Sequence, residues 1–376
     1  INDLYVPKPI QLEIIEEESI QDILDESTDS LDIINEYIPI IVTVAGNGIA
    51  GYYGDNGLAL DGKLNKPYAV ILDSQNNMFV AERNNNIIRK ISNQGIITTF
   101  AGTGEAGYSG DCNCCKQAKF SLPVCLEFDS KENLYIGDGL NYVIRKINKN
   151  SDIIETIVGT GKCGISDDGT YAKLSSIGGT SIAFDQNDNL YIADTKNNCI
   201  RMIFNGQTNS LINILIGNLS NEDIGKIFTI AGNKTSIYSG DNGMANEAGI
   251  VQPLDIAIDK MNNIYIVDHI NSVIRKISSF TGIIKRYAGA LALVKNITNI
   301  TTSKINDATI HKMSSIDGIV KNNDSNNYSN ISGNALNIKL NKPFSITIDN
   351  DQNVYISDKD NHVIRKVSND GIMKTI

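Results

Sequence analysis

The 376-residue chain is 41% apolar and carries a net charge of −10, so it is long enough to bury a large core. No apolar run approaches 18 residues, which argues against a membrane span, and no basic stripe suggests nucleic-acid binding. The charge is concentrated at one end. Residues 1–46 hold eleven acidic residues against the single base Lys8, whereas acidic and basic residues balance over residues 47–376.

The acidic first stretch contains a weak copy of a pattern that recurs clearly further along the chain. The segment 8–15 (KPIQLEII) reads as a strand that begins after a Pro, and 40–46 (IIVTVAG) reads as a strand that ends in Gly. Because the apolar residues keep the phase of the later copies, residues 5–46 are interpreted as a degenerate repeat. The alternative is a disordered acidic tail with one strand at its end.

Five later segments repeat the same order of four short strands, here named a to d. Strand c ends in a nearly constant phrase, from NNIIRKI (85–91) to NHVIRKV (361–367), and strand b before it ends in an acid. Asn, Asp and Gly occupy the turns, as expected for tight connections. The predicted units are 5–46, 64–102, 120–159, 176–232, 250–289 and 340–376, with insertions at 204–226 and 290–327.

Repeated units of this size bury little surface alone and must pack on their neighbours. Strand a is apolar on both faces in 66–73 (KPYAVILD), which is typical of a strand buried between two sheets. A radial arrangement buries each sheet against the next. A linear solenoid is the competing arrangement. The sequence therefore predicts one all-β domain, a six-bladed β-propeller.

The order of AGTGEAGYSGD (101–111), a Pro-led strand, NLYIGD (133–138) and NYVIRKI (141–147) resembles the NHL repeat family. The resemblance implies a six-bladed propeller that serves as a binding platform. Some members of the family bind RNA, some bind protein, and a few amidating lyases use zinc. The chain departs from the RNA-binding members in lacking basic charge, and from the lyases in having only His269, His311 and His362.

The Arg of each strand c shares one face of its strand with the flanking apolar residues, so it is expected to be buried and to need a carboxylate. The acid that ends strand b is the candidate partner, and a blade-locking role is favoured over a ligand clamp. The predicted structural ion pairs are Glu82 with Arg89, Asp138 with Arg145, Asp194 with Arg201, Asp268 with Arg275, and Asp358 with Arg365.

The Gly-rich loops between units, such as GYYGDNG (51–57), are attributed to turns that need positive φ. They lack the spacing of an EF-hand, so calcium binding is the less favoured alternative, and no cofactor is predicted. The b-to-c and d-to-a connections are expected on one face of the ring, the preferred partner surface. Four cysteines lie in these loops: Cys112, Cys114, Cys115 and Cys163. Disulfides between them are favoured over the two alternatives, a zinc cluster and free thiols.

Two further candidate sites follow from local composition. Glycosylation sequons cluster in and beside the second insertion, at Asn296, Asn299, Asn323, Asn327 and Asn330. The acidic stretch, with candidate docking residues Glu16, Glu17 and Glu18, is expected either to face a cationic partner or to remain a solvated surface.

The sequence as a whole favours a non-catalytic module for protein binding, scaffolding or assembly, located outside the cell or on the surface of a cell or particle. The alternative is an enzyme at the mouth of the central channel, as in propellers that resemble gluconolactonases or amidating lyases. The second residues of the inner strands bear on this choice. Only one of them is acidic, which is a poor set of ligands for a hard cation.

Overall fold

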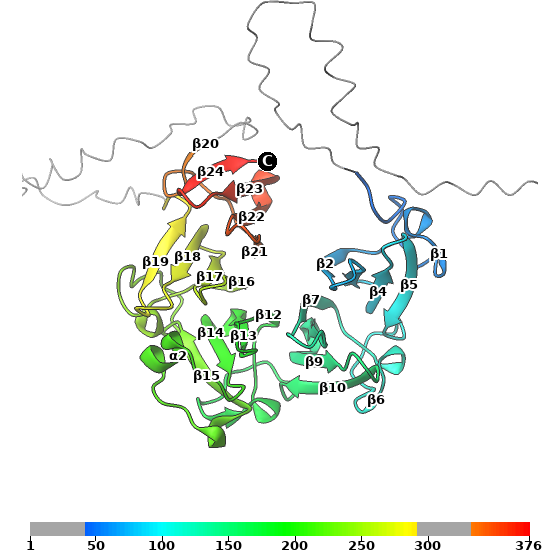
Figure 1. Ribbon diagram of the computed structural model, residues 1–376, viewed down its shortest axis with the longest axis horizontal. Coiled ribbons are helices and arrows are strands. Elements are labelled where there is room, and N and C mark those ends of the chain that lie inside the picture. Colours follow the sequence, from blue (N-terminus) through cyan, green and yellow to red (C-terminus); the bar gives the residue numbers. More distant parts are fainter. Residues whose placement is uncertain (1–41, 292–331) are drawn as a thin grey trace, which may run out of the picture. The chain divides into compact units, whose positions relative to one another are not determined.

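The computed structural model describes residues 42–291 and 332–376, and the propeller lies within Val44–Ile376. Its strands form five antiparallel sheets, one for each clear copy of the repeat (Figure 1). The prediction of six blades is therefore wrong for the described chain. Residues 5–41 of the expected first unit lie outside the described residues. Residues 42–46, expected to form its last strand, form no strand, and Val42 and Val44 are exposed.

Each blade contains the four predicted strands in the order a to d, so the repeat assignment holds from residue 64 onward. The inner strands, a, are β2 (Pro67–Leu72), β7 (Pro123–Phe128), β12 (Ser181–Phe184), β16 (Pro253–Ile258) and β21 (Ile346–Ile348). Strands b are β3 (Met78–Glu82), β8 (Leu134–Asp138), β13 (Leu190–Asp194), β17 (Ile264–Asp268) and β22 (Val354–Asp358).

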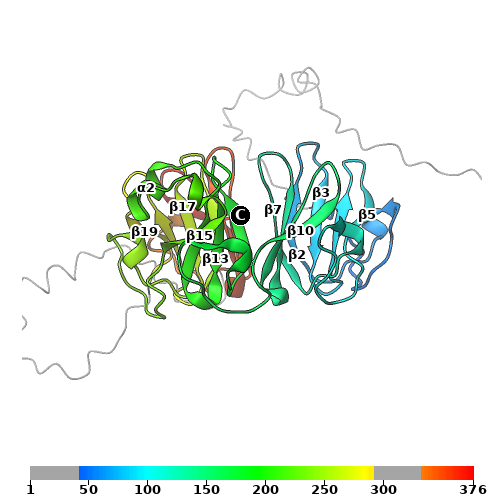
Figure 2. The same cartoon turned by 90° about the horizontal axis from the view of Figure 1, so that it is seen from below.

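The two outer strands complete each sheet. Strands c are β4 (Ile87–Ile91), β9 (Val143–Ile147), β14 (Cys199–Ile203), β18 (Val273–Ile277) and β23 (Val363–Val367). Strands d are β5 (Ile96–Ala101), β10 (Ile153–Val158), β15 (Lys226–Ala231), β19 (Ile284–Ala288) and β24 (Ile372–Thr375). The blades seen from the side in Figure 2 have strands that run between two faces, where the turns gather.

The d-to-a connection does more than join one blade to the next. After crossing over, it runs along the outer edge of the new blade and adds a short strand beside strand d, in all sheets but the fourth. These strands are β1 (Gly57–Leu58), β6 (Asn113–Cys114), β11 (Thr170–Tyr171) and β20 (Ser332–Asn334). Short 3-10 turns follow in blades 1 to 4, at Ala59–Asp61, Cys115–Gln117, Ala172–Leu174 and Ala245–Glu247.

The insertion in the third blade lies between strands c and d, as predicted. It contains the short helix α2 (Ser210–Leu215) and a 3-10 turn at Asn221–Asp223. The side chain of Asn209 caps the helix by accepting a hydrogen bond from the backbone N–H of Ile212 at 2.9 Å. Leu211, Ile212 and Leu215 join the core between the third and fourth blades, so this insertion is a packed part of the fold.

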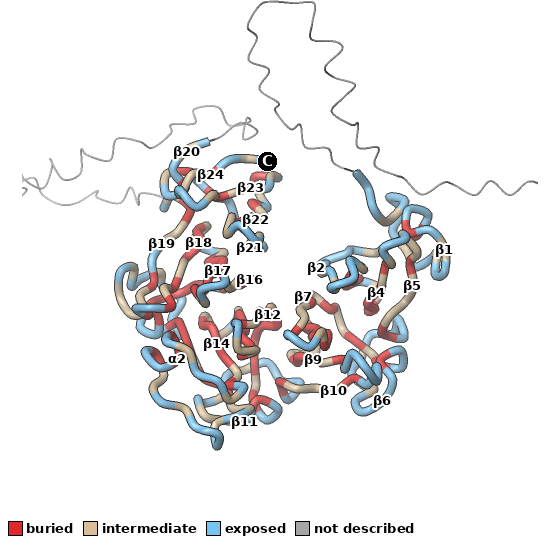
Figure 3. Tube along the Cα trace, in the orientation of Figure 1, coloured by how far each residue is buried: buried red, intermediate tan, exposed pale blue. Residues whose placement is uncertain are grey.

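The core lies between neighbouring blades, where the strands are buried (red in Figure 3). Successive inner strands pack side by side, from β2 with β7 to β16 with β21. All five line one cavity, which excludes the solenoid. β2 departs from the expected double-sided burial, because Tyr68, Val70 and Leu72 are exposed on the face turned away from β7. The ring of Tyr68 contacts that of Phe344 edge-on, with centroids 5.4 Å apart, and so joins the first blade to the fifth.

Polar side chains fix the joints between blades at corresponding positions. The backbone N–H that precedes strand a donates to a side chain in the b-to-c turn of the preceding blade: Leu122 to Asn86, Gln252 to Asn198, and Lys342 to Ser272. At the opposite face, Glu132 accepts from the backbone of Ser74, and Asp188 accepts from Ser130. These bonds set the angle between neighbouring sheets.

Candidate functional site

The buried arginine of strand c is the most regular feature of the blades. Arg89, Arg145, Arg201, Arg275 and Arg365 are all fully buried. In the first four blades, Nη2 of the arginine donates to an aspartate of the Gly-rich loop, at 2.6 to 3.2 Å. These aspartates, which sequence reasoning missed, are Asp55, Asp111, Asp168 and Asp241. Each lies 33 or 34 residues before its arginine, a spacing that was available in the sequence.

The acids that end strand b lie near the arginines to different degrees. Glu82 accepts from Arg89 at 3.0 Å, and Asp358 accepts from Nε of Arg365 at 3.1 Å. Asp138 is 3.8 Å from Arg145, and Asp194 is 4.0 Å from Arg201, both beyond hydrogen-bond length. Their carboxylates accept instead from Asn141 and Asn197 in the following turn.

The predicted pair of Asp268 and Arg275 is not formed within 4.0 Å. Arg275 turns toward the loop, where Nη1 donates to the carbonyl of Gly249 and Nη2 to that of Ser239 and to Asp241. Asp268 accepts from Asn271 at 2.7 Å, and burial raises its pKa to about 6. The arginines and the acids that end strand b are fully enclosed, and the partly exposed loop aspartates hold the outer loop against the blade.

A tyrosine covers the outer side of three of these arginines. The ring of Tyr52 lies 5.3 Å from Arg89, that of Tyr108 lies 5.2 Å from Arg145, and that of Tyr238 lies 4.6 Å from Arg275. The loop aspartates, whose Asp-x-Gly runs raised the weak possibility of calcium, are thus engaged by guanidinium groups. Among the described residues, no three His, Cys, Asp or Glu side chains converge to hold a metal.

The inner strands of all five blades line one central cavity of about 640 Å³. The residue two places after the Pro that opens each unit, or after Gly179 in the third blade, lines it: Ala69, Cys125, Ser181, Asp255 and Ser345. Asp255 accepts from the hydroxyl of Ser181 at 2.5 Å and from the backbone of Ile346 at 2.9 Å. Burial is the main cause that raises the pKa of Asp255.

Glu127, two residues further along strand β7, also lines the cavity and was missed by a count restricted to the second positions. Burial, followed by the charge of Asp255, raises its pKa to about 8. Two carboxyl groups therefore share the interior of the channel, and near neutral pH Glu127 is mostly protonated. The alternation of strand β7 was the signal that could have identified it.

One end of the propeller carries the b-to-c turns together with the first halves of the d-to-a loops. Asn85, Asn141 and Asn197 of the turns donate to the carbonyls of Gly51, Gly107 and Gly164 in the loops, at 2.7 to 2.8 Å. We call this end the turn-and-loop face. Its exposed aliphatic side chains, 43 to 70% accessible, come from four successive blades: Ile49, Leu140, Ile165, Ile237 and Ile270. In the described loops that enter blades 1 to 4, the second half leaves this face for the outer edge, contrary to prediction.

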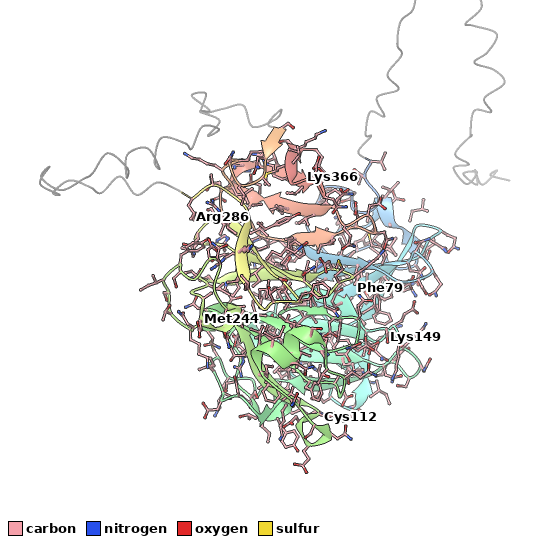
Figure 4. All side chains as sticks on the ribbon, turned by 60° about the vertical axis from the view of Figure 1, so that its left-hand side comes forward. Phe79, Cys112, Lys149, Met244, Arg286 and Lys366 are labelled. Atoms are coloured by element: carbon pink, nitrogen blue, oxygen red, sulfur yellow. The ribbon has the colours of Figure 1, made fainter. Side chains whose placement is uncertain are left out.

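The course of the d-to-a loops, from the turn-and-loop face to the outer edge, separates the four loop cysteines. Cys112 (labelled in Figure 4) and Cys114 are exposed. Cys114 pairs with Ile153 at the start of strand d, on the outer edge of the second blade. Cys115 is buried between the first two blades. Cys163 lies near Lys196, whose pKa is raised mainly by its hydrogen bond with Tyr142 and less by the cysteine. All six cysteines are free thiols in the structure, so a disulfide remains a prediction.

The remaining candidate sites lie outside the described residues. They are the docking acids Glu16, Glu17 and Glu18 and the sequons Asn296, Asn299, Asn323, Asn327 and Asn330. In the described part of the chain, no helix is long and apolar enough to cross a membrane.

The sheets, their order around one cavity and the buried arginines define the protein as a β-propeller. It is 25% identical to mouse teneurin-4 over 236 residues, which make up 59% of this chain and 8% of the teneurin. It is 26% identical to chicken teneurin-1 over 239 residues, 60% of this chain and again 8% of the relative. The chain thus matches a small part of much longer proteins.

Among solved structures, virginiamycin B lyase from Staphylococcus aureus superposes with a TM-score of 0.42 and 15% identity, covering 82% of this chain and 69% of the lyase. No family model matches the sequence.

Proposed function

We propose that this chain is an NHL-type propeller that binds a protein partner through the turn-and-loop face and does not catalyse a reaction. The observation that supports the proposal is the set of five exposed aliphatic side chains on that face, contributed by blades 1 to 4. Exposed apolar side chains gathered on one face of a rigid scaffold are typical of a protein interface. At the turns of the opposite face, the large exposed apolar residues come from the third and fourth blades only: Ile214, Ile224, Met261 and Phe280.

The sequence supplies the other parts of the proposal. The clustered sequons of the insertion at 290–327 favour a location outside the cell or on a cell or particle surface. The acidic residues 1–46 offer a second route to a cationic partner, or to a copy of the same chain, by electrostatic steering.

The test uses the full chain, tagged and expressed in its native source, with the partner identified by cross-linking and mass spectrometry. The affinity of the purified partner is then measured for Leu140→Glu and Ile270→Glu, which place a charge on the proposed interface. We expect both changes to weaken binding at least about tenfold. Met261→Glu, on the opposite face, is the matched control. Equal affinities for all three variants would show that another surface binds the partner.

Catalysis at the channel mouth is the second candidate function. The raised pKa of Glu127 beside Asp255 favours it, because perturbed carboxyl groups in a cavity are typical of catalytic sites. Hydrolysis of lactone substrates by the purified chain, abolished in Glu127→Gln, would support this alternative. Unchanged background hydrolysis in both proteins would argue against it.

A further inference from the structure

Two cations line the central cavity without an acidic partner. Arg83 and Lys196 belong to the b-to-c turns of the first and third blades, and both contribute to the cavity wall. Among the residues that the structure describes, neither lies within ion-pair distance of a carboxylate. The arginines of strands c, in contrast, all have acids beside them. Cations at a cavity mouth that lack an internal counterion leave their charge available to a ligand.

The surroundings of Arg83 strengthen this point. Its guanidinium lies 5.2 Å from the ring centre of Tyr68, and its Nε atom is buried without a hydrogen-bond acceptor. Its two terminal nitrogens, Nη1 and Nη2, are not buried in this way and can donate to a ligand in the cavity. The ring of Phe344 packs against Tyr68 and extends the aromatic wall.

Lys196 is held in place across the same mouth. Its ammonium donates to the hydroxyl of Tyr142 at 2.6 Å and lies 4.6 Å from the centre of that ring. The hydrogen bond raises the pKa of Lys196, so the amine stays charged. Two of its three donor hydrogens remain for another acceptor. Both cations are therefore presented on aromatic rings, a preorganised arrangement that binds anions with little loss of side-chain freedom.

The cavity changes character with depth. Below the cations lie the hydroxyl of Ser181 and the carboxyl of Asp255, near the start of their strands, and Glu127 lies about 7 Å deeper by strand rise. The mouth is thus positive and aromatic, and the interior has acids and hydroxyls. The volume of about 640 Å³ suits a small molecule, since ligand pockets usually measure roughly 300–1,000 Å³.

We propose that the channel mouth binds a small organic anion, whose carboxylate or phosphate group pairs with Arg83 and Lys196 and whose apolar part packs on Tyr68 and Phe344. A hydroxyl on such a ligand would reach the Ser181 and Asp255 pair. This site adjoins the turn-and-loop face at Leu140, which lines the same cavity, whereas Ile270 does not. A nucleic acid does not fit, because two cations on a neutral body cannot neutralise a phosphate backbone.

The experiment is isothermal titration calorimetry of the full chain with three probes: inorganic phosphate, phenyl phosphate and benzoate. We expect phenyl phosphate to bind more tightly than inorganic phosphate, because only the former has a ring for the aromatic wall. The comparison of phenyl phosphate with benzoate decides between a phosphate and a carboxylate ligand. Arg83→Gln and Lys196→Gln should each weaken binding of the preferred probe by about tenfold or more.

Lys285→Gln is the matched control, since it removes the same charge from an exposed position on strand β19. It should leave the affinity unchanged. Thermal melting of every variant shows whether it is folded, and Arg83→Lys, which keeps the charge, should retain most of the binding if Arg83→Gln proves unstable. Failure of all three probes to bind the parent protein at millimolar concentration would overturn the proposal. So would an equal loss in the control.

Discussion

Arg145 donates through Nη2 to Asp111 at 2.6 Å, while Asp138, at the end of the neighbouring strand, lies 3.8 Å from Nη1. The shorter ion pair thus joins the blade to its outer loop, and the longer one lies within the sheet. Asp111 is 38% exposed at its side chain, whereas Asp138 is fully enclosed. The arginine therefore links a buried carboxyl to one at the edge, and its removal affects both.

Truncation of Arg145 to Ala should lower the free energy of unfolding by about 3–5 kcal/mol, because it leaves Asp138 in a buried site without a cation. Burial already raises the pKa of Asp138 to about 6. Urea unfolding followed by circular dichroism measures the change. The control is Lys149→Ala, which breaks an exposed pair with Glu132 and should cost about 0–1 kcal/mol. Matching losses for the two variants would contradict a buried role for Arg145.

A second prediction concerns the dependence of stability on pH. The pKa of Glu127 is about 8 in the folded chain, against an ordinary value of 4.5, so the folded state binds the proton more tightly than the unfolded state does. Its stabilising contribution is complete below the unfolded value and is lost as the pH rises through about 8. The free energy of unfolding should therefore fall between about pH 5 and about pH 8.

Glu127→Gln removes this titration and should flatten the decline, which denaturant unfolding at several pH values can measure. Asp255 contributes a decline of the same sign, because its pKa is also raised. Asp255→Asn therefore provides a second comparison. A parent and a Glu127→Gln variant with parallel pH profiles would show that the carboxyl of Glu127 is solvated like that of an ordinary glutamate.

The repeat could be predicted from sequence because its signals are local. A Pro before strand a, an acid ending strand b and the phrase around the arginine all lie within one blade, and alternation places Arg145 inside it. The true partner of that arginine could not be predicted from strand order alone. Asp111 lies in a loop whose course along the outer edge depends on the short strand β6, which has only two residues.

The number of blades was harder still to predict, since it depended on treating a degenerate segment as a full unit. Apolar residues at the right phase in 40–46 suggested a strand, but residues 42–46 lack partners in a sheet. For the residues of the channel, the sequence analysis predicted too little rather than too much. Glu127 was overlooked although its position in strand β7 follows from the same alternation that identified Cys125.

The cysteines should differ sharply in their reaction with iodoacetamide under native conditions. Cys115 and Cys199 are buried, and burial raises the pKa of each to about 12, so few thiolates are available. The exposed Cys112, Cys114 and Cys163 should be labelled first if they are free. Peptide mass spectrometry gives the order. A native mass lower by two hydrogens, with labelling restored by reduction, would instead confirm the predicted disulfide.

The last prediction concerns Gly137, where the repeat pattern and the packing between blades lead to different expectations for a substitution by Ala. Gly137 in strand β8 occupies the position that Ala81, Ala193 and Val267 hold in other blades, so the sequence alone predicts that Ala would be tolerated there. The structure predicts a clash, because a Cβ atom at Gly137 would lie 2.1 Å from the backbone carbonyl oxygen of Thr180 in the third blade.

Relief of this contact would require a shift of the third blade, since the obstacle is backbone rather than a flexible side chain. Gly137→Ala should therefore lower the free energy of unfolding by about 1–3 kcal/mol, the usual effect of overpacking a core. Gly333→Ala in strand β20 is the control, since a Cβ atom there meets nothing within 4 Å. Chemical denaturation of both variants beside the parent decides the matter. If Gly137→Ala is as stable as the parent, the second and third blades are less closely packed than their contacts indicate.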